Sequence, residues 1–376
     1  MKKLISILIA IVFVGTILVP IVTSAQNVEW ANFQQREWAR FQLWDPHALK
    51  HIDTTKYKKN PPYTIVYVDC SVSNVWAAFT AQEYKAEAER WKVKGVIKGW
   101  FHTDAQDKPD KQIADIEDMM VKKVDLMIIR PATEAALDPI VTKVHREGVP
   151  VICLSRRIKS DNFISHVVTS NFASARVMMV WLAQMLKGKG NIVMLWGKEG
   201  SSTVAERMKG AKEALSQYPG IKVLDEQHTG WSAARGKSVM QAMIQSFGKK
   251  INGVFSDYGL EGMGAIEALH EAGMKVPITG DTINGFMSRV QKWGFPAVVV
   301  GYSPMMGGDS VKLGLKILQG IPVPFSYQAP GIVIATHDTP DVKSEMGWKD
   351  FALMDKADDY YPDNNLRDEI GKKFMP

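Results

Sequence analysis

Polar and aromatic side chains follow the short apolar runs of this sequence at the points where each run ends. Asn74 and Trp76 come after residues 64–69, and Arg130 closes residues 125–130. Other residues in equivalent positions are Ser155, Arg156, Tyr258, Asp281 and Tyr302. Ligands of open parallel sheets bind outside the carboxyl ends of the strands, so these positions are candidates for a binding site.

Motifs for catalysis and for metal binding are missing from the chain. The sequence holds no H-E-x-x-H, C-x-x-C or G-x-S-x-G pattern, and its eight histidines are scattered. Residues 197–202 look superficially like a phosphate loop but lack G-x-x-x-x-G-K-[ST]. The missing motifs argue against an enzyme, although catalytic groups are often distant in sequence, and we assign no catalytic residue, no metal and no cofactor.

The elements that must position these residues alternate between strand-like and helix-like patterns. Strands are expected at residues 64–69, 96–102, 125–130, 149–154, 164–169, 191–196, 222–227, 253–257, 276–280 and 297–302. Helices are expected at 75–91, 109–122, 135–147, 173–186, 204–217, 233–247, 260–272, 285–292 and 305–318. This alternation is typical of parallel sheets covered by helices on both faces. There are about twice as many units as one doubly wound sheet carries, which favours two lobes.

Composition and charge fit a globular protein of two domains. The 376 residues are 46% hydrophobic and 23% charged, which allows a substantial core. The formal net charge is +6 and no long block of Lys and Arg is present, so nothing points to nucleic acid as a partner.

The N-terminus has the layout of a secretory signal peptide. Lys2 and Lys3 precede an uncharged apolar stretch at residues 4–19, and small residues follow at 23–25. We expect cleavage after Ala25 and a periplasmic or other extracytoplasmic location. The alternative is a retained membrane anchor, since residues 4–22 are just long enough to span a bilayer.

The two cysteines, Cys70 and Cys153, each lie at the end of an expected strand. In the usual strand order of such a sheet a third strand separates them, which is too wide a gap for a disulfide. We expect two free, buried thiols.

From about Tyr63 to Ala335 the chain resembles the periplasmic sugar-binding proteins of the ribose-binding type, which serve ABC importers. The segments that carry the resemblance, in order, are TIVYVDCSVSNVW (64–76), LMIIRP (126–131), GVPVICLSR (148–156), ISHVVTSN (164–171), GKEGSSTVAERMKG (197–210), NGVFSDYGLEGMGAIEAL (252–269) and VPITGDTINGF (276–286). No single segment is decisive, but the set in one order is fairly specific.

The resemblance implies two doubly wound α/β lobes joined by three hinge crossings, with the ligand cleft between them. The crossings fall near residues 169–170, 302–303 and 331. The N-terminal lobe would comprise 61–169 and 303–330, and the C-terminal lobe 170–302 and 331–345. A lead-in at 26–60 and a tail at 346–376 lie outside the lobes.

The resemblance also implies roles for individual residues. Asn74, Trp76 and Trp231 fall at the positions of the family's amide and aromatic contacts, and Arg156 and Arg207 match arginines that hydrogen-bond ligand hydroxyls. An aromatic ring stacks on the C–H face of a sugar, and arginine presents a fork of donors to neighbouring oxygens.

The departures from the family pattern bear on the ligand. Ser155 replaces an Asp, Arg130 stands where Asn is common, and Tyr258 and Tyr302 replace an amide-bearing pair. The late acid or amide falls to Asp281 or Asn284. Three arginines with one acid would suit a carboxylate or phosphate, unless Arg130 turns away to a local acid. A neutral sugar is placed slightly ahead of an anionic ligand.

The expected partners are a small sugar-like ligand and the membrane permease of an ABC transporter, with the protein itself a monomer. Three alternatives stay open to different degrees. The same module would serve a membrane receptor as a ligand sensor, and a secreted α/β enzyme would need a catalytic pair that we cannot name. A sugar-responsive repressor would need an N-terminal helix-turn-helix in place of the signal peptide.

Overall fold

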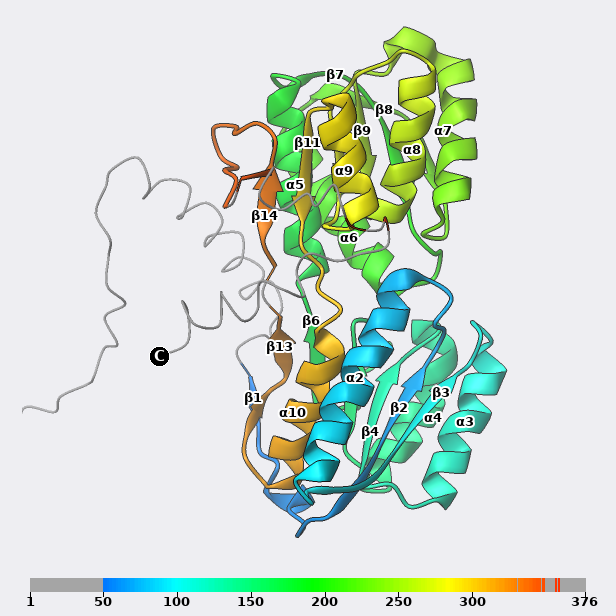
Figure 1. Cartoon of the computed structure of the whole chain (residues 1–376), viewed down its shortest axis with the longest axis vertical. Helices are drawn as coiled ribbons and strands as arrows, with labels where there is room; N and C mark the ends of the chain where they lie inside the picture. The colour runs from blue at the N-terminus through cyan, green and yellow to red at the C-terminus, as the bar shows by residue number, and fades with distance from the viewer. Residues whose placement is uncertain (1–49, 330, 346, 349–355, 357, 359–376) are drawn as a thin grey trace, which may run out of the picture.

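The computed structural model describes residues 50–329, 331–345, 347–348, 356 and 358, and they form two α/β lobes (Figure 1). The predicted signal peptide at 1–25, most of the lead-in at 26–60 and most of the tail at 346–376 lie outside the described residues. The predicted fold class is confirmed: two sheets dominated by parallel strands are each covered by helices on both faces.

The first sheet belongs to the N-terminal lobe. Its strand order is β13-β6-β5-β4-β2-β3, and all neighbouring strands are parallel. The strands are β2 (Tyr63–Asp69), β3 (Ile97–Asp104), β4 (Leu126–Arg130), β5 (Val151–Leu154), β6 (Ser165–Val168) and β13 (Ser326–Gln328). The helices of this lobe are α2 (Val75–Val93), α3 (Pro109–Val121), α4 (Glu134–Arg146) and α10 (Met306–Leu318).

The second sheet belongs to the C-terminal lobe and has the order β14-β11-β10-β9-β7-β8. Its strands are β7 (Lys189–Trp196), β8 (Gly220–His228), β9 (Gly253–Ser256), β10 (Ile278–Gly280), β11 (Ala297–Val300) and β14 (Val333–Ala335). Its helices are α5 (Asn171–Met185), α6 (Ser202–Leu215), α7 (Ala233–Phe247), α8 (Gly259–Glu271) and α9 (Asn284–Trp293). Only β14 runs antiparallel to its neighbour, and no strand was predicted there from the sequence.

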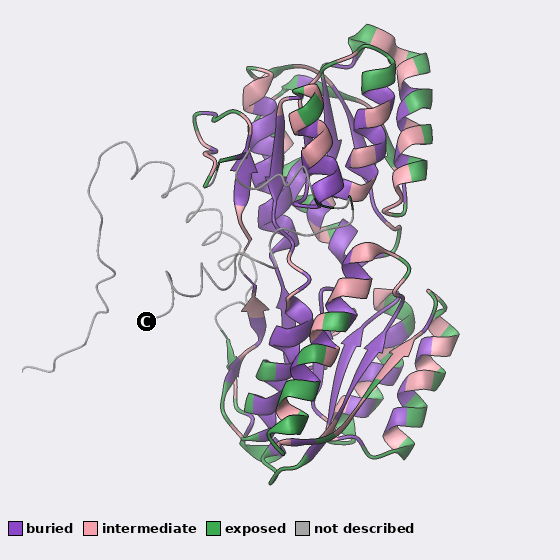
Figure 2. Ribbon diagram, in the orientation of Figure 1, coloured by how far each residue is buried: buried purple, intermediate pink, exposed green. Residues whose placement is uncertain are grey.

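Side chains that alternate along each strand fill a separate core on either face of the sheet. In β2, Ile65 and Tyr67 pack with residues of α2 and α10, whereas Val66 and Val68 pack with residues of α3 and α4. The strands are therefore apolar on both faces, as parallel strands between two helical layers must be. Figure 2 shows both sheets as buried ribbons beneath helices that are exposed on their outer sides.

Three segments join the lobes, and they lie side by side. They run from β6 to α5, from β11 to α10, and from β13 to β14 (Figure 1). The hydroxyl of Thr169 donates to the carbonyl of Ala329 at 3.2 Å, and the amide of Gly301 donates to the carbonyl of Ile332 at 2.7 Å. The predicted crossings near 169–170, 302–303 and 331 fall within these segments, and the exact lobe boundaries stay a prediction.

The ends of the described chain pack against the lobes. β1 (His51–Ile52) pairs with β12 (Val323–Pro324), and the 3₁₀ turn η1 (Thr55–Tyr57) buries Tyr57. At the other end, the indole of Trp348 donates to the carbonyl of Met287 in α9. Asp358 forms an ion pair of 2.9 Å with Arg289 of the same helix. Among the described residues, no helix is long and apolar enough to cross a membrane.

Cys70 and Cys153 are both free and buried, which confirms the expectation from the sequence. Strand β4 lies between β2, which precedes Cys70, and β5, which contains Cys153. Burial raises the pKa of Cys153 to about 12, so this thiol stays protonated and packs as a small apolar group.

Candidate functional site

A cleft lined by both lobes lies at the carboxyl ends of the central strands. The space between its walls is about 340 Å³, including the part that opens to solvent. The lining residues are Asn74, Trp76, Arg130, Ser155, Arg156, Thr203, Arg207, Trp231, Tyr258 and Tyr302.

Nine of the ten residues that the sequence singled out therefore meet in one place. Asp281 is the exception, because its Oδ1 atom accepts the backbone amides of Gly259 at 2.9 Å and Ile283 at 3.4 Å and so holds the start of α8. Asn284, the other candidate for the late amide, donates to the carbonyl of Lys356 instead. Neither residue is among those that line the cleft.

Thr203 is the lining residue that the sequence reasoning missed. It lies in the first turn of α6, and its hydroxyl is 3.4 Å from the carbonyl oxygen of Ser155 in the opposite lobe. In its segment, GKEGSSTVAERMKG, the sequence analysis names only Arg207 as a site residue. The run of small hydroxyl residues directly before the helix was the signal that pointed to it.

Arg130 forms a buried ion pair beneath the N-terminal wall of the cleft. Its Nη2 atom lies 2.6 Å from Oδ1 of Asp69, and its Nε also donates to that oxygen at 2.7 Å. Its remaining contacts are the hydroxyl of Tyr67 and the carbonyl of Ser71. Burial alone would lower the pKa of Arg130, but the charge and hydrogen bond of Asp69, together with Cys70 and Tyr67, outweigh burial and raise it. Arg130 thus does turn to a local acid, while its guanidinium still borders the cleft.

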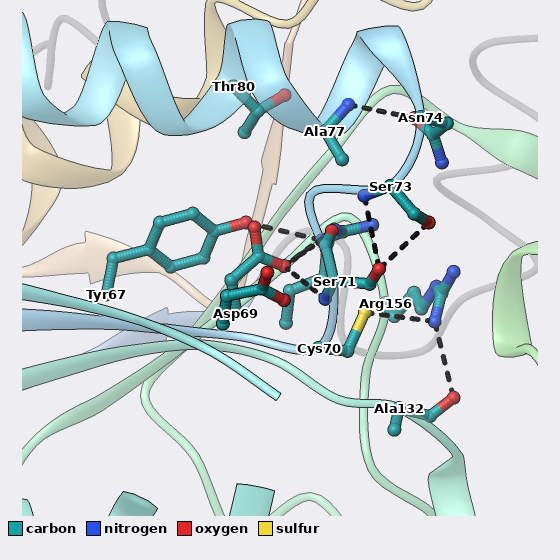
Figure 3. A network of polar contacts seen from close by, with 12 residues as sticks. Tyr67, Asp69, Cys70, Ser71, Ser73, Asn74, Ala77, Thr80, Ala132 and Arg156 are labelled. Atoms are coloured by element: carbon teal, nitrogen blue, oxygen red, sulfur yellow. Dashed lines mark hydrogen bonds and ion pairs between the residues drawn. The ribbon is translucent and has the colours of Figure 1, made fainter. Parts of the chain in front are cut away.

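Arg156 has a different environment, with no carboxylate partner among the described residues. Its Nη1 atom lies 3.3 Å from Sγ of Cys70 and 3.3 Å from the carbonyl oxygens of Pro131 and Ala132. Figure 3 shows the contacts with Cys70 and Ala132 at the edge of the polar network around Asp69. The residue is 4% exposed, so its positive charge is buried, and it interacts with the charge of Asp107 without forming an ion pair.

Arg207 enters the cleft from α6 in the C-terminal lobe. Its Nε donates to Oδ1 of Asn171 at 3.1 Å, and its Nη1 donates to the carbonyl of Asp257 at 2.7 Å. The carboxylate of Asp257 lies 3.8 Å away, behind the wall of the cleft. These contacts fix the guanidinium plane while Asp257 balances its charge.

Each of the three arginines also lies over an aromatic ring of the cleft. The distances from guanidinium carbon to ring centroid are 5.6 Å for Arg130 and Trp76, 5.1 Å for Arg156 and Trp231, and 4.9 Å for Arg207 and Tyr302. Such cation–π contacts hold the arginine planes in place and are strongest where water is excluded. The pair of Arg156 and Trp231 joins opposite lobes.

The backbone is strained at two of the lining residues. Ser155 has φ 62° and Trp231 has φ 60°, both in the left-handed region that favours glycine. Each costs on the order of 1–3 kcal/mol, and such strain concentrates at ligand sites. The indole Nε1 of Trp231 is in addition buried without a hydrogen-bond partner in the described chain. The fold therefore holds Trp231 in place although its backbone is strained and its indole N–H has no hydrogen-bond partner in the described chain.

A pair of buried carboxyl groups lies behind the C-terminal wall. Asp257 and Glu261 are both buried, and Glu261 accepts the hydroxyl of Thr229. Burial, together with the negative charge of Asp257, raises the pKa of Glu261 well above its ordinary value. The fold thus favours a protonated Glu261 beside an Asp257 that faces Arg207.

The mouth of the cleft widens into a hollow of about 820 Å³, including the part that opens to solvent, and this hollow shares Asn74, Arg130, Arg156 and Trp231 with the cleft. Lys198 and Asp107, from opposite lobes, line this hollow and form an ion pair of 2.6 Å. In the described residues, no group of three or more His, Cys, Asp or Glu side chains is arranged to hold a metal ion. The side chains that line the cleft can form hydrogen bonds, stack on a ligand through their rings and supply positive charge. These are the interactions that bind a small polar ligand.

Comparison with known proteins points to one family. Residues 65–322 match the family described as periplasmic binding protein domain. The xylitol-binding protein of Mycolicibacterium smegmatis is 31% identical over 212 residues, which are 56% of this chain and 60% of that protein. The ribose import binding protein of Haemophilus influenzae is 28% identical over 218 residues, 58% of this chain and 74% of that protein. The chain thus spans less than two thirds of the length of the first of these relatives.

Solved structures agree in fold over most of the chain. A galactofuranose binding protein matches with a TM-score of 0.69 and 25% identity, covering 80% of this chain and 100% of that one. The fructose binding periplasmic domain of a hybrid two component system matches with a TM-score of 0.68 and 26% identity, covering 83% of this chain and 97% of that one.

Proposed function

Because this chain belongs to the periplasmic binding protein domain family, we propose that it captures a sugar or sugar derivative outside the cytoplasm and delivers it to the permease of an ABC importer. The observation that carries the proposal is the cleft, whose polar and aromatic walls come from both lobes. A ligand that touches both walls stabilises the closed arrangement of the lobes, so its binding free energy drives the hinge.

The relatives support this ligand class and this role. Two similar proteins are named for xylitol binding and for ribose import. Relatives of this kind are binding proteins, so no chemical step belongs to the proposal. We place the mature protein in the periplasm or an equivalent extracytoplasmic space, as a monomer whose chain begins near Gln26.

The decisive experiment measures binding on the purified mature chain. A thermal-shift screen against sugars, polyols, sugar acids and sugar phosphates should find a compound that raises the melting temperature by mass action. Calorimetry with that compound should show one site per chain, and the recovered compound should be chemically unchanged. Steady turnover of the compound would contradict the proposal, and so would the failure of every compound in the screen.

A second function is favoured by one comparison. The fructose binding domain of a two component system is matched over nearly its whole length, and that domain is part of a sensor. The same lobe closure would then signal to a membrane receptor. Deletion of the gene separates the two roles: loss of uptake of the bound compound favours import, while intact uptake with a lost transcriptional response favours sensing.

A further inference from the structure

The cleft is rich in cationic donors and has no acid on its walls. Three of its ten lining residues are arginines, and none is Asp or Glu. A ligand composed only of hydroxyl groups needs acceptors as well as donors, because each hydroxyl carries a proton to donate.

Several guanidinium nitrogens in this cleft make no hydrogen bond to a described residue. They are Nη1 of Arg130, Nε and Nη2 of Arg156, and Nη2 of Arg207, since the contacts of these side chains involve their other nitrogens. The indole Nε1 of Trp231 is a further unpartnered donor. The residues that carry these nitrogens line the cleft from both lobes.

The charges around the cleft leave one positive charge without a counterpart. Arg130 is balanced by Asp69 at 2.6 Å, and Arg207 by Asp257 at 3.8 Å. At the mouth Lys198 is balanced by Asp107, and beyond the wall Arg157 lies 3.3 Å from Glu206. Arg156 forms no ion pair in the described chain: its Nη1 contacts a thiol and two carbonyl groups, and its guanidinium lies over the ring of Trp231. Its charge interacts with Asp107, but that carboxylate is already paired with Lys198.

A buried charge without a counter-ion costs free energy, and a bound anion removes that cost. We infer that the ligand is a hydroxylated compound with a single negative charge, a sugar carboxylate whose acid group binds to Arg156. This inference rests on the proposed function and specifies its ligand. Charge also argues against a sugar phosphate, because a phosphate monoester carries about −1.5 to −2 at neutral pH and exceeds the single unbalanced charge.

The test compares matched acids and neutral sugars on the same protein by calorimetry. The acids are D-gluconate, D-glucuronate and D-galacturonate, the neutral counterparts are D-glucose and D-galactose, and glucose 6-phosphate probes the dianion. We expect at least one acid to bind at least about tenfold more tightly than both its neutral counterpart and the phosphate. Its affinity should also fall with rising salt, as screening predicts.

Replacement of Arg156 by methionine tests the effect of its charge separately from the length of its side chain. Arg156→Met keeps a long side chain against Trp231 but removes the charge, and it should weaken binding of the acid by about 30-fold or more. Arg146→Met, at the exposed end of α4, is the control and should leave binding unchanged. The wild-type panel decides the question if Arg156→Met fails to fold.

Three results would overturn the inference. The first is a neutral sugar that binds as tightly as its acid, and this result would leave the proposed function standing. The second is a phosphate that binds more tightly than any acid, which would also leave that function standing. The third is that no acid on the panel binds, and only the wider screen described above then decides whether the chain is a sugar-binding protein.

Discussion

The side chains of Lys198 and Asp107 form an ion pair of 2.6 Å that joins the two lobes at the mouth of the cleft. Lys198 follows β7 of the C-terminal lobe, and Asp107 follows β3 of the N-terminal lobe. Burial of Asp107 acts to raise its pKa, but its hydrogen bond and charge interaction with Lys198, with smaller contributions from Arg156 and Ser71, outweigh burial and lower it. This ion pair therefore supports the arrangement in which the two lobes meet at the cleft.

We predict that Lys198→Met opens the ligand-free protein without unfolding it. The two side chains are about a third exposed, 33% and 36%, so their pair contributes only about 0–1 kcal/mol. Small-angle X-ray scattering at low salt should show a larger radius of gyration for the variant. The control is Lys222→Met on exposed β8, and equal radii for Lys198→Met and wild type would contradict the prediction.

We predict that Trp231→Ala weakens ligand binding while the fold is retained. The indole lies over Arg156 of the opposite lobe, so its loss removes apolar contact with the ligand and admits water around the guanidinium. Affinity should fall by about fivefold or more, equivalent to about 1 kcal/mol. Trp293→Ala, whose ring stacks on His270 in a different region of the C-terminal lobe, is the matched control. Unchanged calorimetric affinity for the Trp231 variant would show that the indole is not part of the site.

We predict that Gly197→Ala also weakens binding, although Gly197 has no side chain to offer a ligand. A Cβ atom there would lie 1.9 Å from Nε1 of Trp231, so the indole has to move. The change should appear both in ligand affinity and in tryptophan fluorescence. Gly99→Ala adds the same methyl group where nothing lies within 4 Å and should alter neither signal. Wild-type affinity in Gly197→Ala would mean that the position of Trp231 does not matter.

We predict that Glu261→Gln stabilises the protein increasingly as the pH rises above about 5. The pKa of Glu261 is raised in the folded state by burial and by Asp257. Its contribution to stability is therefore complete below the unfolded pKa and is lost as the pH rises through the folded pKa. Glutamine resembles the protonated acid and does not titrate, so the two proteins should be equally stable near pH 4 and differ most at pH 8. Urea unfolding at several pH values measures the difference.

Glu271 on the same helix provides a control of opposite sign. Its hydrogen bond with Lys237 lowers its pKa, so Glu271 stabilises the fold above the unfolded pKa and ceases to do so in acid. Glu271→Gln should therefore lose stability toward neutral pH, where Glu261→Gln gains it. Parallel pH profiles for the two variants would refute the assignment of a raised pKa to Glu261.

The sequence by itself determined the two-lobe fold and most of the residues around the cleft. Apolar runs of four to eight residues that alternate with helical patterns form strands that are buried between two layers of helices. The alternation therefore predicted parallel sheets, and the number of units predicted two of them. Parallel strands carry their following residues to one edge of the sheet, and this rule was enough to select Trp76, Arg130, Ser155 and Tyr258. The strands β12 to β14, which have two or three residues each, were not predicted.

Only the tertiary structure decided what each of those residues does. Position after a strand cannot tell whether a side chain faces the ligand or a neighbouring backbone, and Asp281 proved to hold the amides that begin α8. Nor can sequence give charge balance, which depends on distances of a few ångströms between residues far apart in the chain. Asp69 lies 61 positions from Arg130 and neutralises it, while Arg156 is brought beside a thiol and two carbonyl groups. Coulomb energy depends on the distance between two charges in space and not on their separation along the chain. Only the folded arrangement therefore shows that Arg156 is the arginine of the cleft without an ion pair.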